Sequence, residues 1–130
     1  MKAVLDHIGI AVEDIDAALA FYRDALGLEI EAAEEVASQR VRAHVIPTGE
    51  GALELLEATA PDSPIAKYLQ KRGPGIHHIT LRVDDIAAWE RHLTEAGATF
   101  QPRKQRPDGA WQIFLRDPDG HFIELFVPPA

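Results

Sequence analysis

An internal repeat constrains this sequence more than any other feature, because it limits the chain to folds built from two similar halves. Residues 5–15 match residues 76–86 at an offset of 71 residues. Further along, Glu54-Leu55 matches Glu124-Leu125 at an offset of 70 residues. Because the offset changes by a single residue between these matches, we interpret the chain as a duplicated half.

Each half has the pattern of a strand, a helix and three further strands. In the first half, alternating apolar residues predict a strand over 5–12, and Asp14 is a suitable N-cap for a helix that ends at Gly27. In the second half, Asp85 begins the helix and Gly97 ends it. The remaining predicted strands cover residues 29–34, 41–46, 52–57, 76–83, 99–104, 110–116 and 122–127. The expected fold class is therefore α+β, with two βαβββ modules.

A chain of 130 residues is the size of one domain. Within it we expect a first module over 1–57, a linker over 58–75 and a second module over 76–130. The linker contains three prolines, and Ser63 followed by Pro64 predicts a short helix that ends at Gly73. We interpret this helix as docked on the domain, so the linker does not mark a domain boundary.

Charge and composition exclude several classes of function. The net charge is −8, and an acidic chain without a basic stripe is a poor nucleic-acid binder. The absence of cysteine excludes disulfides, thiolate metal sites and cysteine nucleophiles. No apolar run is long enough to span a membrane, and the first residues do not resemble a signal peptide, so a cytoplasmic protein is expected.

Strand alternation places His7 and His78 at equivalent positions of the two halves. His7 lies on the strand face opposite Ile8 and Ile10, which are predicted to pack under a helix. His78 lies opposite the core face formed by His77, Ile79, Leu81 and Val83. Both imidazoles are therefore expected on the side of the sheet that the helices leave open.

Glu54 and Glu124 follow the same rule on the strands that end each half. Glu54 lies opposite the face of Leu53 and Leu55, and Glu124 shares its face with Phe122 and Phe126. A carboxylate between two phenylalanines is costly to bury unless its charge is compensated.

Two imidazoles and two carboxylates are a suitable ligand set for a divalent cation such as Co²⁺, Zn²⁺, Mn²⁺ or Ni²⁺. The absence of sulfur ligands argues against a closed structural zinc site, so open positions would remain for substrate. The alternative is four unrelated surface residues. Their recurrence at one offset, all on the non-core face, favours a metal site formed by His7, Glu54, His78 and Glu124.

The duplicated pattern, with Asp6-His7-Ile8 in one half and His78-Ile79 in the other, resembles the vicinal oxygen chelate superfamily over nearly the whole chain. This resemblance implies two βαβββ modules curved into an open half-barrel that holds a divalent metal, with ligand positions that fall on the four residues named above. Within the superfamily the chain most resembles the methylmalonyl-CoA epimerases, on segments 5–12, 21–28, 53–56 and 62–79.

The resemblance implies a proton shift at the carbon between a thioester and a carboxylate, and therefore an acyl-CoA substrate and, as is usual in the family, a homodimer. Glu124 would act as a ligand and as one base. The family's second glutamate aligns with Ser38, which is no general base at neutral pH. Glu34 or Glu35, from the same loop, is the alternative for that role.

Two other functions remain open for the same fold. The turn Asp117-Pro118-Asp119-Gly120 resembles glyoxalase I, ring-cleaving dioxygenases and drug-binding resistance proteins. A glyoxalase-I-like lyase and a non-catalytic ligand-binding protein are therefore the alternatives. Two basic clusters could contact the phosphates of CoA, but solvated surface charge is the favoured interpretation of both: Lys67, Lys71 and Arg72, and Arg103, Lys104 and Arg106.

Overall fold

The computed structural model describes residues 1–130 and has a mixed α+β architecture, which confirms the predicted fold class. The first seven elements are β1 (Val4–Ala11), α1 (Ile15–Leu19), the π-helix η1 (Ala20–Ala25), β2 (Glu34–Val36), the 3₁₀ helix η2 (Ala37–Gln39), β3 (Val41–Thr48) and β4 (Gly51–Ala58). The remaining six are α2 (Pro64–Arg72), β5 (Gly75–Arg82), α3 (Ile86–Glu95), β6 (Lys104–Gln105), β7 (Trp111–Arg116) and β8 (Phe122–Val127).

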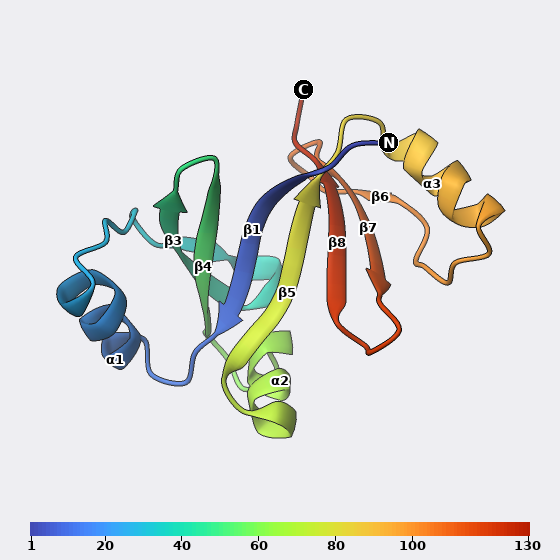
Figure 1. Ribbon diagram of the computed structural model, residues 1–130. Coiled ribbons are helices and arrows are strands. Elements are labelled where there is room, and N and C mark those ends of the chain that lie inside the picture. The colour runs from blue at the N-terminus through green and yellow to red at the C-terminus, as the bar shows by residue number, and fades with distance from the viewer. The chain divides into compact units, whose positions relative to one another are not determined.

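The strands form one eight-stranded sheet in the order β2-β3-β4-β1-β5-β8-β7-β6 (Figure 1). The pairs β1–β4 and β5–β8 are parallel, and the pairs β2–β3, β3–β4, β6–β7 and β7–β8 are antiparallel. None of the helices has the length and apolar composition that crossing a membrane requires.

The chain divides into two compact units, which we call the N-terminal unit (His7–His77) and the C-terminal unit (Met1–Asp6 with His78–Ala130). The succession of one strand, one helical segment and three strands occurs once on either side of α2. The proposed partition into modules 1–57 and 76–130, joined by a linker over 58–75, stays a prediction.

In the N-terminal unit, the predicted N-caps are confirmed. Asp14 accepts hydrogen bonds from the backbone N–H groups of Asp16 and Ala17 at 3.0 and 3.2 Å, and α1 begins there. Ser63 accepts from Ile65 N–H at 3.1 Å, and α2 begins with Pro64 at its first turn. These side chains satisfy backbone donors that have no partner within the helix.

The predicted strands over 29–34 and 99–104 are largely wrong. In their place are the short edge strands β2 and β6 and an isolated bridge between Phe100 and Leu115. The first segment is rich in Glu and Ala, which are depleted in strands. The second contains Pro102, which cannot donate to a strand ladder.

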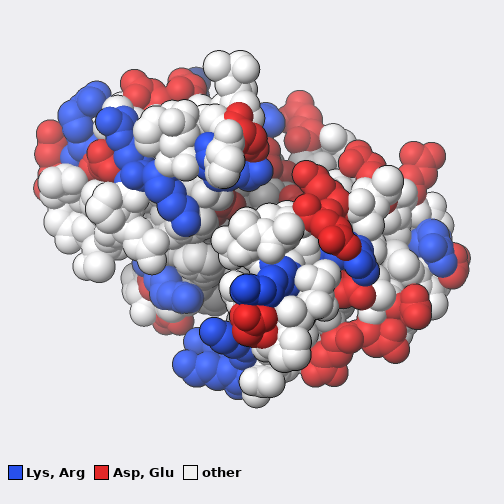
Figure 2. All heavy atoms as spheres, turned by 180° about the vertical axis from the view of Figure 1, so that it is seen from behind, with Lys and Arg blue, Asp and Glu red and all other residues white.

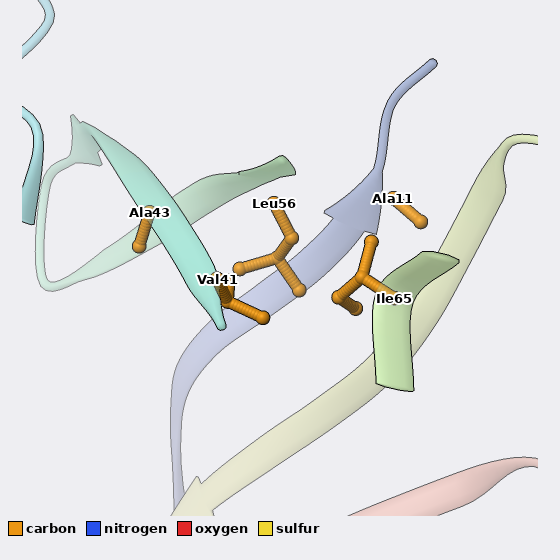
Figure 3. Close-up of a cluster of buried hydrophobic side chains, with 5 residues drawn as sticks. All are labelled: Ala11, Val41, Ala43, Leu56 and Ile65. Atoms are coloured by element: carbon orange, nitrogen blue, oxygen red, sulfur yellow. The ribbon is translucent and has the colours of Figure 1, made fainter. Parts of the chain in front are cut away.

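Helix α2 covers part of the sheet face that sequence alternation assigned to the site. Its Ile65 packs against Ala11, Val41, Ala43 and Leu56, and the close-up shows these side chains gathered between α2 and the strands (Figure 3). All five are buried. Helix α1 contacts β4, where Leu55 is fully buried with its side chain on the opposite face from Leu56. The N-terminal unit is therefore packed on both faces.

In the C-terminal unit, the predicted core face is confirmed at Leu81 and Val83. Val83 packs with Ile86, Ile113 and Leu125 in one buried cluster, and Leu81 lies against it. Helix α3 covers this face through Trp89 and Leu93. The opposite face of β5, β7 and β8, which carries His78 and Glu124, is not covered by α3.

Candidate functional site

His7 and Glu54 form a contact pair in the N-terminal unit. Strands β1 and β4 run parallel with Gly9 beside Glu54 and His7 beside Ala52, so both side chains project from one face. His7 Nδ1 lies 3.1 Å from Glu54 Oε2, and the side chains are 14% and 22% exposed. Sequence alternation predicted this shared face correctly.

His78 and Glu124 form the corresponding pair in the C-terminal unit. Strands β5 and β8 run parallel with Thr80 beside Glu124, which places His78, Thr80 and Glu124 on one face. The metal-ligating atoms of His78 and Glu124 lie within 4.8 Å of each other. Glu124 is 7% exposed, so its carboxylate is buried.

Two neutral side chains hold the Glu124 carboxylate, and sequence reasoning missed their role. Thr80 Oγ1 donates to Glu124 Oε1 at 2.7 Å, and Gln112 Nε2 donates to Glu124 Oε2 at 2.5 Å. Each oxygen therefore has a donor, and the orientation of the carboxylate is fixed. The available signal was strand alternation, which puts Thr80 and Gln112 on the face of Glu124.

A pair of stacked aromatic rings borders Glu124 on the same face. Phe114 is the direct cross-strand partner of Glu124, and Phe122 lies two residues before it on β8. The rings of Phe114 and Phe122 stack with centroids 5.4 Å apart and planes 18° apart. His78 meets the edge of Phe122 with centroids 6.5 Å apart, so the rings limit the space around both ligand candidates.

The strand register separates the two candidates for a second base. Glu34 pairs with Ala43, which pairs with Leu56, so Glu34 lies on the face of Leu56 and Glu54. Glu35 pairs with Arg42 on the opposite face.

Glu35 is also occupied by an ion pair. Its Oε1 accepts hydrogen bonds from Arg42 Nε and Nη2 at 3.1 and 2.6 Å, and the hydrogen bond with Glu35 is the main cause that raises the pKa of Arg42. Ser38 lies in the exposed helix η2, and no side chain hydrogen-bonds with its hydroxyl group.

The donor set fits a divalent cation in chemical type and in burial. Each unit has one imidazole and one carboxylate on a shared face, and nitrogen and oxygen ligands without sulfur suit borderline divalent ions. Thr80 and Gln112, which donate hydrogen bonds to the buried Glu124 carboxylate, are both neutral, so a nearby positive charge would compensate its charge. The hydrogen bonds from Thr80 and Gln112 are of the kind that orients ligating carboxylates.

Comparisons with known proteins agree with this architecture. Residues 4–125 match the model of the Glyoxalase/Bleomycin resistance protein/Dioxygenase superfamily. The ethylmalonyl-CoA/methylmalonyl-CoA epimerase of Cereibacter sphaeroides is 42% identical over 127 residues, which cover 93% of this chain and 95% of that protein.

Solved structures give the same result. The methylmalonyl-CoA epimerase of Mycobacterium tuberculosis has a TM-score of 0.82 at 33% identity, covering 97% of this chain and 88% of that chain. A variant of the Streptomyces coelicolor methylmalonyl-CoA epimerase in complex with 2-nitronate-propionyl-CoA has a TM-score of 0.84 at 32% identity. The match covers 100% of this chain and 97% of that chain. Relatives and structural neighbours thus confirm the resemblance seen in the sequence, and the chain belongs to the Glyoxalase/Bleomycin resistance protein/Dioxygenase superfamily.

Proposed function

We propose that this protein is a divalent-metal-dependent epimerase that moves a proton at the carbon between the thioester and the carboxylate of a branched acyl-CoA. The proposal rests on one observation above all: each compact unit presents one histidine and one glutamate on a single sheet face. The similarity to proteins named as methylmalonyl-CoA epimerases supports the substrate class.

His7, Glu54, His78 and Glu124 are proposed to hold the cation, which is Co²⁺, Zn²⁺, Mn²⁺ or Ni²⁺. When bound, such an ion polarises a carbonyl oxygen and stabilises the negative charge that develops there. The protein contributes by fixing the ligands. Thr80 and Gln112 hold both oxygens of Glu124, so little reorganisation of this carboxylate is needed when substrate binds.

Inversion at carbon requires one group that removes the proton and another that returns a proton from the opposite side. Glu124 is proposed as one of these groups. The base takes the proton, the electron pair of the broken C–H bond delocalises into the thioester carbonyl, and a carboxylic acid on the other side forms the new C–H bond. Because the same residues serve both directions, each must alternate between carboxylate and carboxylic acid.

Glu34 is proposed as the second group, in preference to Glu35 and Ser38. It shares the face of Glu54, and its side chain is exposed. Glu35 faces the other way and is tied to Arg42. A serine without an activating partner does not exchange protons with carbon at neutral pH.

The experiment incubates Co²⁺-loaded protein with methylmalonyl-CoA in D₂O. We expect one deuteron at C2, detected by mass spectrometry, together with interconversion of the two enantiomers. Protein that binds Co²⁺ but neither exchanges the C2 proton nor interconverts the enantiomers would contradict the proposal. Turnover of methylglyoxal with a thiol would favour the lyase alternative instead.

The variants Glu34→Gln and Glu35→Gln form a matched pair for the second base. Loss of one base in a two-base epimerase stops proton removal from one enantiomer and leaves exchange from the other. We therefore expect one-sided exchange in Glu34→Gln and two-sided exchange in Glu35→Gln. The homodimer also stays a prediction, which light scattering during size-exclusion chromatography would test.

A further inference from the structure

Two cations stand over the aromatic rings that border Glu124. Lys104 Nζ lies 4.7 Å from the ring centroid of Phe114, and the Arg116 guanidinium carbon lies 4.8 Å from that of Phe122. We propose that Lys104 and Arg116 form an anion-binding subsite for an anionic oxygen group of the substrate. This inference rests on the proposed function, because it concerns the same acyl-CoA.

The strand register places both cations on the face of the sheet that carries Glu124. Arg116 is the cross-strand partner of Phe122, and Lys104 pairs with Gln112, the residue that donates to Glu124. Phe114 and Phe122, the rings below the cations, stack on each other. One stacked aromatic pair therefore presents a positive charge on each of its rings beside the proposed metal ligand.

Neither cation is neutralised by a carboxylate. Lys104 has no ion-pair partner in the structure, and Arg116 donates from Nη1 to the backbone carbonyl of Gly120 at 2.9 Å. Arg103 and Arg106, which lie on either side of Lys104 in the chain, are paired with Glu90 and Asp108. The two cations on the rings thus keep their charge available in a protein whose net charge is −8.

The rings also reduce the cost of binding an anion. A cation on an aromatic face is attracted by the ring quadrupole, which restricts the long side chain before the ligand arrives. Less side-chain entropy is then lost when an anion is bound. Both residues are exposed, so an incoming group can reach them from solvent.

An acyl-CoA of a dicarboxylic acid offers two kinds of anion: the free carboxylate of the acyl group and the phosphates of CoA. Both present oxygens that ammonium and guanidinium groups bind by charge-assisted hydrogen bonds. The sequence alone indicated solvated charge at Lys104, and its position over Phe114 favours a binding role instead.

The experiment measures KM and kcat for methylmalonyl-CoA in Lys104→Met, Arg116→Met and the double variant. Arg91→Met is the matched control, because Arg91 is an exposed cation on α3, which covers the other face of the same sheet. We expect KM to rise about five- to tenfold in each single variant and more in the double variant, with kcat nearly unchanged. The salt dependence of KM should also become weaker in the double variant.

Methylmalonyl-pantetheine, which lacks the nucleotide phosphates, separates the two sources. A KM defect that persists with this substrate assigns the subsite to the carboxylate, and a defect that disappears assigns it to the phosphates. Folded single and double variants with the KM of the Arg91→Met control would overturn the subsite.

Calorimetric titration with CoA and with methylmalonate keeps this inference separate from the proposed function. If the wild-type protein catalyses no exchange, the proposed function fails. The subsite is then supported only if either anion binds the wild-type protein more tightly than the double variant, and it is overturned if both proteins bind equally.

Discussion

The two histidine–glutamate pairs occupy equivalent positions but have different surroundings. In the N-terminal unit, His7 and Glu54 contact each other at 3.1 Å and their side chains are 14% and 22% exposed. In the C-terminal unit, Glu124 is 7% exposed and held by Thr80 and Gln112. Equivalent positions in the two halves therefore do not imply equivalent burial. We propose that the more buried C-terminal pair anchors the cation and that the N-terminal pair adapts to it.

The units also differ in charge. The N-terminal unit has six Lys and Arg against twelve Asp and Glu, a net charge of −6, and the C-terminal unit has seven against nine, a net charge of −2. Figure 2 shows one face of the molecule, on which blue side chains gather toward the left of the view and red ones predominate on the right. An anionic substrate is therefore expected to meet the less acidic C-terminal unit more favourably.

The largest expected effect is on the rate of proton exchange, and it differs between substitutions of Glu124 and Glu54. Glu124→Gln should lower the rate of C2 proton exchange about 10³-fold, because it removes a proposed base and a charged ligand together. Glu54→Gln should cause a smaller loss, because only a ligand is removed. Exchange rates and Co²⁺ affinities of both variants check this order, and equal losses would contradict the distinction between an anchoring and an adapting pair.

The next comparison concerns the two cores. Ile113 is fully buried beneath α3, so Ile113→Ala should lower the free energy of unfolding by about 3 kcal/mol. Leu56, in the cluster beneath α2, is 6% exposed, so Leu56→Ala should lower the free energy of unfolding by somewhat less. Urea denaturation of both variants measures the difference. A negligible loss at Ile113 would show that the C-terminal core is not packed as described.

Removal of one hydrogen bond to Glu124 tests the anchor itself. Thr80→Val keeps the shape of the side chain and removes the hydroxyl that donates to Glu124 Oε1. Metal affinity should fall about 10- to 100-fold, as it does when orienting partners of ligands are lost. Calorimetric titration with Co²⁺ checks this expectation, and unchanged affinity would mean that Thr80 only fills space.

Helix caps give a smaller effect in both units. Ser63→Ala and Asp85→Ala each remove a side chain that accepts a backbone N–H at the start of α2 or α3. Each should cost about 1 kcal/mol of stability. The larger loss of stability is expected for Ser63→Ala. Ser63 is fully buried, so the Ile65 N–H group that loses its acceptor would lie away from water. Thermal denaturation monitored by circular dichroism compares the two.

The smallest effect is the pH dependence that one carboxyl group of the C-terminal unit contributes. In the β7–β8 turn, hydrogen bonds from the His121 backbone and side chain lower the pKa of Asp117. Because the folded-state pKa is lowered, the stabilisation is present above the ordinary pKa of about 3.9 and is lost as the pH falls through the lowered value. Nuclear magnetic resonance titration of the Asp117 carboxyl group would detect this, and an ordinary pKa would contradict it.

Sequence reasoning predicted the parts of this fold that depend on local pattern. The repeat and strand alternation placed His7 with Glu54 and His78 with Glu124, and the caps at Asp14 and Ser63 followed from residue type. The hydrogen bond from Thr80 to Glu124 joins strands far apart in the chain, and the one from Gln112 depends on the register of β7 and β8, so residue spacing alone did not reveal them.

The local sequence pattern also could not predict the edge strands or the residue proposed as the second base. The ends of β2 and β6 depend on pairing with β3 and β7, and the propensity of their own residues is weak. The choice between Glu34 and Glu35 depends on the register of β2, because a shift of one residue exchanges the two faces.

The central claim is that side chains from both halves hold one cation together. Calorimetric titration of Co²⁺ into the wild-type protein, His7→Ala and His78→Ala tests it most directly. The account predicts one ion per chain in the wild-type protein and a large loss of affinity in each variant. Unchanged affinity in either variant, or two independent ions per chain, would contradict it.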